Sequence, residues 1–106
     1  MKSRIILTLI LLALFLRPAS CQAGNYTNFT VAIYIPVGVV ESFQDPQKLT
    51  NDWNRISRQL KVDKVYIEVQ RDRRLAPDEL LEQVKQFFLD RKVQVAGGMA
   101  LSACVQ

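Results

Sequence analysis

The chain has 106 residues, with 14 lysines and arginines, 10 aspartates and glutamates, and no histidine. Three of the basic residues (Lys2, Arg4 and Arg17) and none of the acidic ones lie within residues 1–23, which leaves 11 basic against 10 acidic residues in the rest of the chain. This balance argues against the basic surface of a nucleic-acid-binding or membrane-surface protein. The lack of histidine excludes Ser–His–Asp and Cys–His catalysis and histidine-based zinc sites within these residues.

Residues 1–23 have the three parts of a secretory signal peptide: a positively charged start, an apolar run over residues 5–16, and small residues up to Ala23. The apolar run is shorter than the roughly 20 residues that a membrane-spanning helix needs, so an uncleaved anchor is the lesser alternative. Cleavage after Ala23 predicts a secreted or periplasmic protein whose mature part does not span a membrane. The sequence Ala19-Ser20-Cys21 also resembles the end of a bacterial lipoprotein box, so lipid attachment at Cys21 is an alternative.

A polar connector over residues 24–29 precedes the first predicted strand. Residues 31–35 are β-branched and aromatic and end at Pro36, which is typical of a buried strand. Asp45 and Pro46 then predict the start of a helix, with Asp45 as the N-cap and Pro46 in the first turn. This helix should carry a single apolar stripe, formed by Leu49, Trp53, Ile56 and Leu60.

The second half of the chain repeats this order. Residues 65–69 predict a second strand, and residues 70–75 a charged loop with three arginines. Pro77, followed by two acidic residues that favour the positive end of a helix, predicts a second helix. Its buried face is formed by Leu80, Leu81, Val84, Phe87 and Phe88. Residues 93–96 predict a third strand, which runs into Gly97-Gly98.

Strands that alternate with helices predict an α/β fold with a parallel βαβαβ segment over residues 30–106, and no typical hairpin sequence interrupts it. Right-handed crossovers place both helices on one face of the sheet and leave the other face bare. A (β/α)8 barrel resolves this by curling the sheet, and such a barrel has about 250 residues, so residues 24–106 amount to about a third of one. We therefore expect the first strands of a barrel in a longer protein, with a doubly wound sheet as the alternative.

Three segments carry a resemblance as a set: Val31-Ala-Ile-Tyr-Ile-Pro36, Lys64-Val-Tyr-Ile-Glu-Val-Gln-Arg-Asp72 and Val95-Ala-Gly-Gly98. Together with Lys85-Gln-Phe-Phe88, they resemble the opening of secreted (β/α)8-barrel proteins of the glycoside-hydrolase type. The resemblance covers about residues 30–101. Many such openings have a glycine between the second helix and the third strand, whereas this chain has Arg91-Lys92, which leaves the form of that turn open.

The resemblance implies a site where the strands end, because barrel sites lie at that edge. Glu68, Arg71, Gly97 and Gly98 fall at predicted strand ends, and Tyr34 is close to one. Glu68 and Arg71 could bind sugar hydroxyls or a substrate carboxylate, while the glycines would let the backbone approach a ligand. The alternatives are a structural Glu68–Arg71 ion pair, a packing role for Tyr34, and glycines that only turn the chain.

Glycoside hydrolysis normally needs two carboxylic groups, and Glu68 is the only carboxylate inside a predicted strand. The sequence therefore predicts the front fragment of a carbohydrate-active barrel that contributes substrate contacts and no catalytic pair. No glycine-rich dinucleotide motif follows a strand, and we expect no cofactor and no metal. The alternative is a small secreted or lipid-anchored binding or structural protein without catalytic activity.

Overall fold

The computed structural model describes residues 2–6 and 26–100. Most of the predicted signal peptide, including Cys21, therefore lies outside the described residues, as do residues 101–106 of the predicted barrel segment. Among the residues described, no helix is both long enough and apolar enough to cross a membrane.

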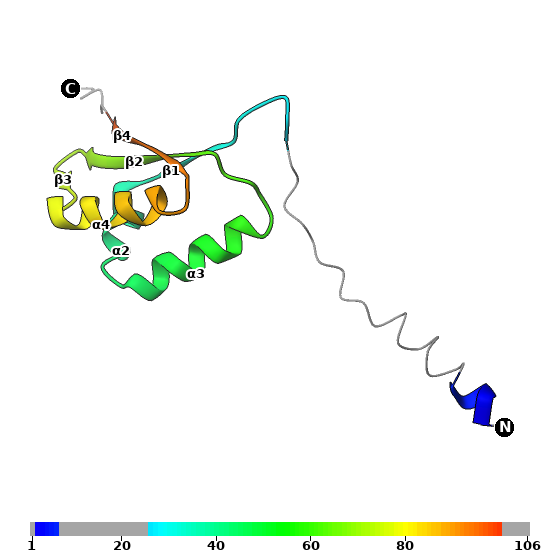
Figure 1. Cartoon of the computed structure of the whole chain (residues 1–106). Coiled ribbons are helices and arrows are strands. Elements are labelled where there is room, and N and C mark those ends of the chain that lie inside the picture. The colour runs from blue at the N-terminus through cyan, green and yellow to red at the C-terminus, as the bar shows by residue number, and fades with distance from the viewer. Residues whose placement is uncertain (1, 7–25, 101–106) are drawn as a thin grey trace.

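The strand and helix order is that of an α/β fold with two additions (Figure 1). The elements are β1 (Ala32–Ile35), α2 (Val37–Ser42), α3 (Pro46–Ser57), β2 (Lys64–Arg71), β3 (Arg74–Leu75), α4 (Asp78–Leu89) and β4 (Gln94–Ala100). The three predicted strands and both predicted helices are present. The short helix α2 and the short strand β3 were not predicted.

The central strand β2 pairs in parallel with β1 on one side and with β4 on the other. Tyr34 lies opposite Tyr66, and Glu68 lies opposite Gly98. The carboxyl ends of the three parallel strands therefore meet at one edge of the sheet, where a barrel protein would carry its site.

The expectation of an uninterrupted parallel sheet is wrong at the end of β2. The segment predicted as a charged loop extends β2 to Arg71 and returns as β3, which pairs antiparallel with β2. Asp72 makes the tight turn possible with a φ of 55°, a left-handed conformation that aspartate adopts more readily than most residues. The sheet is therefore mixed, with its first strands parallel.

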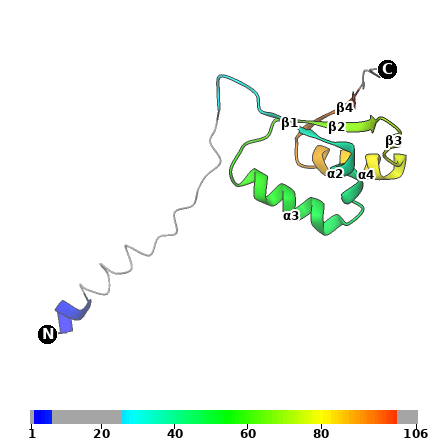
Figure 2. The same ribbon diagram turned by 180° about the vertical axis from the view of Figure 1, so that it is seen from behind.

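All three helices α2, α3 and α4 lie on the same side of the sheet, as Figures 1 and 2 show from opposite directions. Alternation along each strand sends one set of side chains into the space between sheet and helices. The core there consists of Ile35, Val37, Val40, Phe43, Leu49, Val62, Val65, Ile67, Ala76, Leu80, Val84, Phe88 and Val93. On the opposite face, Tyr34 and Tyr66 remain 48% and 38% exposed. The described residues thus cover one face of the sheet and leave the other open, as expected.

Local interactions explain where both predicted helices start. The Asp45 side chain caps α3 by accepting a hydrogen bond from the Gln47 N–H at 3.0 Å, and Pro46 occupies the first turn. In α4, Asp78 and Glu79 lie in the first turn, next to the positive end of the helix dipole.

The turn after α4 has the geometry that a glycine often supplies. The Val93 N–H donates to the carbonyl of Phe88 at 3.1 Å, and the Lys92 N–H donates to the carbonyl of Leu89 at 3.0 Å. This pair of bonds forms a Schellman motif. Lys92 adopts the required left-handed conformation with a φ of 62°. The helix end is therefore intact, although Arg91-Lys92 stands where many similar openings have a glycine.

Candidate functional site

Glu68 is the only fully buried charged side chain in the part of the chain that the structure describes. Alternation along β2 places it with Tyr66 on the face opposite the helices, near the carboxyl end of the strand. A buried carboxylate is unfavourable unless hydrogen bonds and opposite charge replace its lost water. Its surroundings therefore need to supply several donors.

Three elements supply those donors. The Tyr34 hydroxyl, from β1, donates to Oε1 of Glu68. The backbone N–H of Val37, at the start of α2, donates to Oε2 at 2.6 Å. The Arg71 guanidinium binds both oxygens, with Nε 3.2 Å from Oε2 and Nη2 2.8 Å from Oε1. Oε2 thus accepts two hydrogen bonds, while Oε1 accepts one and contacts Nη2 as an ion pair, so neither oxygen is without a partner.

These contacts favour the ionised form of the carboxylate. The hydrogen bonds from Arg71, above all, together with those from Tyr34 and Val37, lower the pKa of Glu68 from 4.5 to about 2, although burial acts in the opposite direction. The hydrogen bond to Glu68 raises the pKa of Tyr34, and the same carboxylate raises the pKa of Arg71. At neutral pH the cluster therefore consists of an anionic Glu68, a cationic Arg71 and a neutral Tyr34.

The Glu68–Arg71 ion pair, the structural alternative to substrate binding by these two residues, is present, and its two members differ in access to solvent. The Glu68 side chain is fully buried, whereas the Arg71 side chain is 49% exposed. Arg71 faces a groove of about 540 Å³ between the start of α2 and the β2–β3 turn. The groove is lined by Pro36, Val37, Gly38, Val39, Glu68, Arg71, Asp72, Arg73 and Arg74. The arginine, and not the carboxylate, is thus the member available to a ligand.

The two glycines lie within β4 and do not turn the chain out of it, so that alternative is wrong. Gly97 pairs with Ile67 and Gly98 with Glu68. A Cβ atom built on Gly98 would lie 3.3 Å from Cε2 of Tyr34. Gly98 therefore leaves room for the Tyr34 ring to extend across the open face of the sheet toward Glu68.

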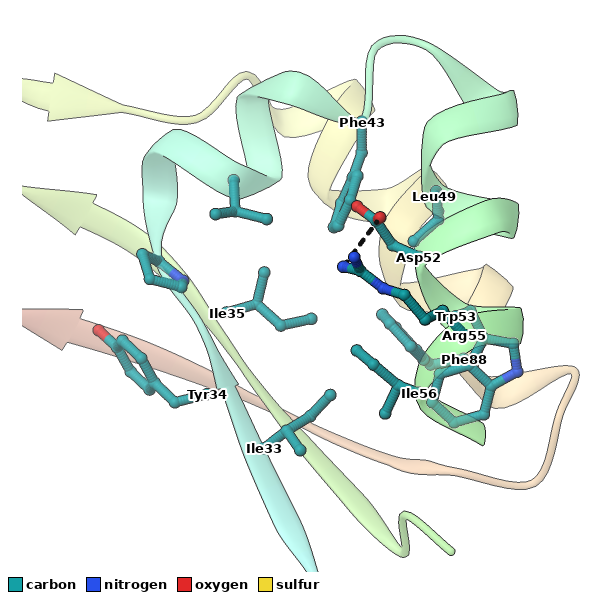
Figure 3. A pocket seen from close by; sticks show the side chains of 12 residues that line it. Ile33, Tyr34, Ile35, Phe43, Leu49, Asp52, Trp53, Arg55, Ile56 and Phe88 are labelled. Atoms are coloured by element: carbon teal, nitrogen blue, oxygen red, sulfur yellow. Dashed lines mark hydrogen bonds and ion pairs between the residues drawn. The ribbon is translucent and has the colours of Figure 1, made fainter. Parts of the chain in front are cut away.

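Figure 3 shows the other side of β1, where a separate apolar pocket lies against α3. Ile33 and Ile35 point toward this pocket, while the Tyr34 ring points away from it. The pocket volume is about 260 Å³, and its polar rim is the Asp52–Arg55 ion pair on α3. This pocket is thus separated from the Glu68 cluster by the strand itself.

Two features of the site had no clear sequence signal. The Val37 N–H reaches Glu68 because Pro36 ends β1 and α2 starts at once, which the apolar sequence of α2 does not indicate. Arg74 lies beside the groove because β3 folds back, and it pairs with Glu41 of α2 at 2.9 Å. Within the described residues, no cluster of His, Cys, Asp and Glu side chains has the arrangement of a metal site.

The family model described as "probable glycosyl hydrolase, catalytic domain" matches residues 18–105. No curated protein and no solved structure matched the chain. The match covers the whole of the sheet, the helices and the Glu68 cluster.

Proposed function

The chain belongs to this family of probable glycosyl hydrolase catalytic domains, and on that premise we propose that it forms the first βα units of an exported, carbohydrate-active (β/α)8 barrel. In this proposal the carboxyl edge of the sheet contacts the sugar through Tyr34, Arg71 and the backbone near Gly97 and Gly98. Glu68 belongs to the site as the group that holds Tyr34 and Arg71 in place.

The observation that carries the proposal is the position of the Tyr34–Glu68–Arg71 cluster. It lies where two neighbouring parallel strands end, beside an open groove. Tyr34 and Arg71 are each about half exposed, so both can contact a ligand while Glu68 fixes their orientation. Side chains that are fixed before the ligand arrives lose less conformational entropy on binding.

The barrel itself is supported by the open face of the sheet. Tyr34 and Tyr66 lie exposed on the face that the helices do not cover. In a barrel this face becomes the interior, where side chains from all strands pack together. Glu68 would then lie near the carboxyl rim of the barrel, with its charge already neutralised by Arg71.

We further propose that the catalytic carboxylates of the barrel are not among the described residues. A general acid must carry a proton near the working pH, and a group with a pKa of about 2 does not. A nucleophile needs a free oxygen facing the substrate, whereas both oxygens of Glu68 are engaged. This chain therefore contributes substrate contacts.

Binding measurements on the full-length protein test the proposal. A panel of neutral and acidic oligosaccharides is titrated by calorimetry against the native protein and against Arg71→Gln and Tyr34→Phe. We expect at least one oligosaccharide to bind. Arg71→Gln should weaken its binding by about tenfold, as for loss of a charge-assisted hydrogen bond, and Tyr34→Phe should weaken it less. Arg58→Gln, which removes the same charge at the C-cap of α3, is the control and should bind normally. Unchanged affinity in both site variants would refute the site.

Export is a separate part of the proposal, based on residues 1–23. Mass spectrometry of the exported protein should find an N-terminus at Gly24 after cleavage behind Ala23. A lipid-modified Cys21 at the N-terminus would show the anchored form instead. An exported protein that retains Met1 would refute cleavage.

A further inference from the structure

The hydrogen-bonding groups that line the groove are unevenly distributed between donors and acceptors. All three carboxylates beside it have partners: Glu68 holds Tyr34 and Arg71, Glu41 holds Arg74, and Asp72 is also engaged. The Glu68 carboxylate, both of whose oxygens are engaged, is therefore not available to a ligand.

Donors, in contrast, are supplied by three arginines that line the groove. Arg71 contacts Glu68 through Nε and Nη2, and its side chain is 49% exposed. Arg74 uses Nη2 on Glu41, while its Nη1 lies close over Gly38 at the groove wall. Arg73 is exposed and has no hydrogen bond or ion pair within the described part of the chain.

The three arginines suit a carboxylate better than a neutral hydroxyl. A sugar hydroxyl both donates and accepts, whereas a guanidinium only donates. A carboxylate group only accepts, and its two oxygens match the planar fork of a guanidinium. The fixed orientation of Arg71 and Arg74, each held by its own carboxylate, adds to this match.

We propose that the groove between α2 and the β2–β3 turn binds the carboxylate of an acidic sugar, such as a uronic acid residue, through Arg71, Arg73 and Arg74. This inference rests on the proposed function and names its substrate class. Arg73 supplies an exposed guanidinium at the groove, and Arg71 supplies oriented donors.

The test compares each acidic oligosaccharide with its own methyl ester, which removes the charge and keeps the sugar. Oligomers of galacturonate, guluronate–mannuronate and glucuronate, their methyl esters, and neutral gluco-, xylo- and manno-oligosaccharides are titrated against the full-length protein. We expect one acidic oligomer to bind at least about tenfold more tightly than its ester, with weaker binding at high salt.

Two arginine variants test where the carboxylate of the sugar binds. Arg73→Gln should weaken binding of the acidic oligomer about fivefold and leave binding of the ester unchanged. Arg58→Gln should leave the affinity for both ligands unchanged. A melting temperature equal to that of the native protein confirms that Arg73→Gln is folded. Equal affinity for acid and ester, or an acidic oligomer that binds Arg73→Gln normally, overturns this inference and leaves the proposed function standing. If no oligosaccharide of either class binds, both fail.

Discussion

Gly98 lies beneath the Tyr34 ring, so a methyl group at this position should disturb the site. A Cβ atom on Gly98 would lie 3.3 Å from Cε2 of Tyr34, which requires the ring to move by a few tenths of an ångström. Gly97 is the matched control, because a Cβ there would meet only Cγ2 of Val69 at an ordinary 3.7 Å. Neither glycine has a positive φ, so alanine is compatible with the backbone at both positions.

The expected magnitudes follow from these contacts. Replacement of a glycine by alanine at a compatible position stabilises a protein by about 0.4–1 kcal/mol, through lower entropy of the unfolded chain. We expect this gain for Gly97→Ala. In Gly98→Ala the crowded ring offsets it, since overpacking typically costs about 1–3 kcal/mol. The two variants should therefore differ by about 1 kcal/mol or more in free energy of unfolding, with Gly98→Ala the less stable.

Two measurements on the full-length protein check this prediction. Urea denaturation gives the stability difference. Ultraviolet absorbance during a pH titration gives the pKa values of the tyrosines, and the step that is missing in Tyr34→Phe belongs to Tyr34. The pKa of Tyr34 reports its hydrogen bond to Glu68. Displacement of the ring should lower the pKa of Tyr34 toward its ordinary value in Gly98→Ala and leave it raised in Gly97→Ala. Equal stability and an identical Tyr34 titration in both variants would show that the Gly98 methyl group does not displace the ring.

Three further predictions concern stability. Because the pKa of Glu68 is about 2 in the folded protein against an ordinary 4.5, its ionised form stabilises the fold above about pH 4.5, and this contribution is lost as the pH falls toward about 2. Urea denaturation should show this loss in the native protein and a smaller one in Glu68→Gln; equal losses would contradict it. Lys92→Gly should raise the free energy of unfolding by about 0.5–1 kcal/mol, because Lys92 has a φ of 62°, and a decrease would show that its side chain stabilises the fold. Asp45→Ala should lower the free energy of unfolding by about 1 kcal/mol through loss of the cap on the Gln47 N–H, whereas Asp45→Asn should retain most of it.

Local sequence signals were enough to predict the main elements. The Asp45-Pro46 start and the stripe from Leu49 to Leu60 predict α3 because capping and helical periodicity are properties of neighbouring residues. The parallel order followed from alternating strands and helices, and β1, β2 and β4 confirm it.

The elements that were missed depend on longer-range contacts or on unusual turn residues. Helix α2 has no side-chain cap, and its sequence Val-Gly-Val-Val favours a strand as much as a helix. The hairpin to β3 turns at Asp72 without a glycine. Strand β4 continues through Gly97-Gly98, residues that are rare in strands, because pairing with β2 supplies the backbone hydrogen bonds.

The candidate site could be predicted only in part, because only some of its contacts join residues that are close in the sequence. Glu68 and Arg71 are three residues apart, so their pairing could be expected from the sequence and is confirmed. The hydrogen bonds from Tyr34 and Val37 depend on the register of β1 against β2, which the sequence does not specify. For that reason the burial of Glu68, and with it the exposed role of Arg71, emerged only from the structure.

A crystal structure of the full-length protein with a bound oligosaccharide would show whether the sugar binds at the carboxyl edge of the sheet. We expect a sugar residue at the carboxyl ends of β1 and β2, with Arg71 within hydrogen-bonding distance of it and with the Glu68 carboxylate still bound to Tyr34 and Arg71. A sugar bound at the amino ends of the strands, or one that contacts no residue of the Tyr34–Glu68–Arg71 cluster, would contradict this expectation.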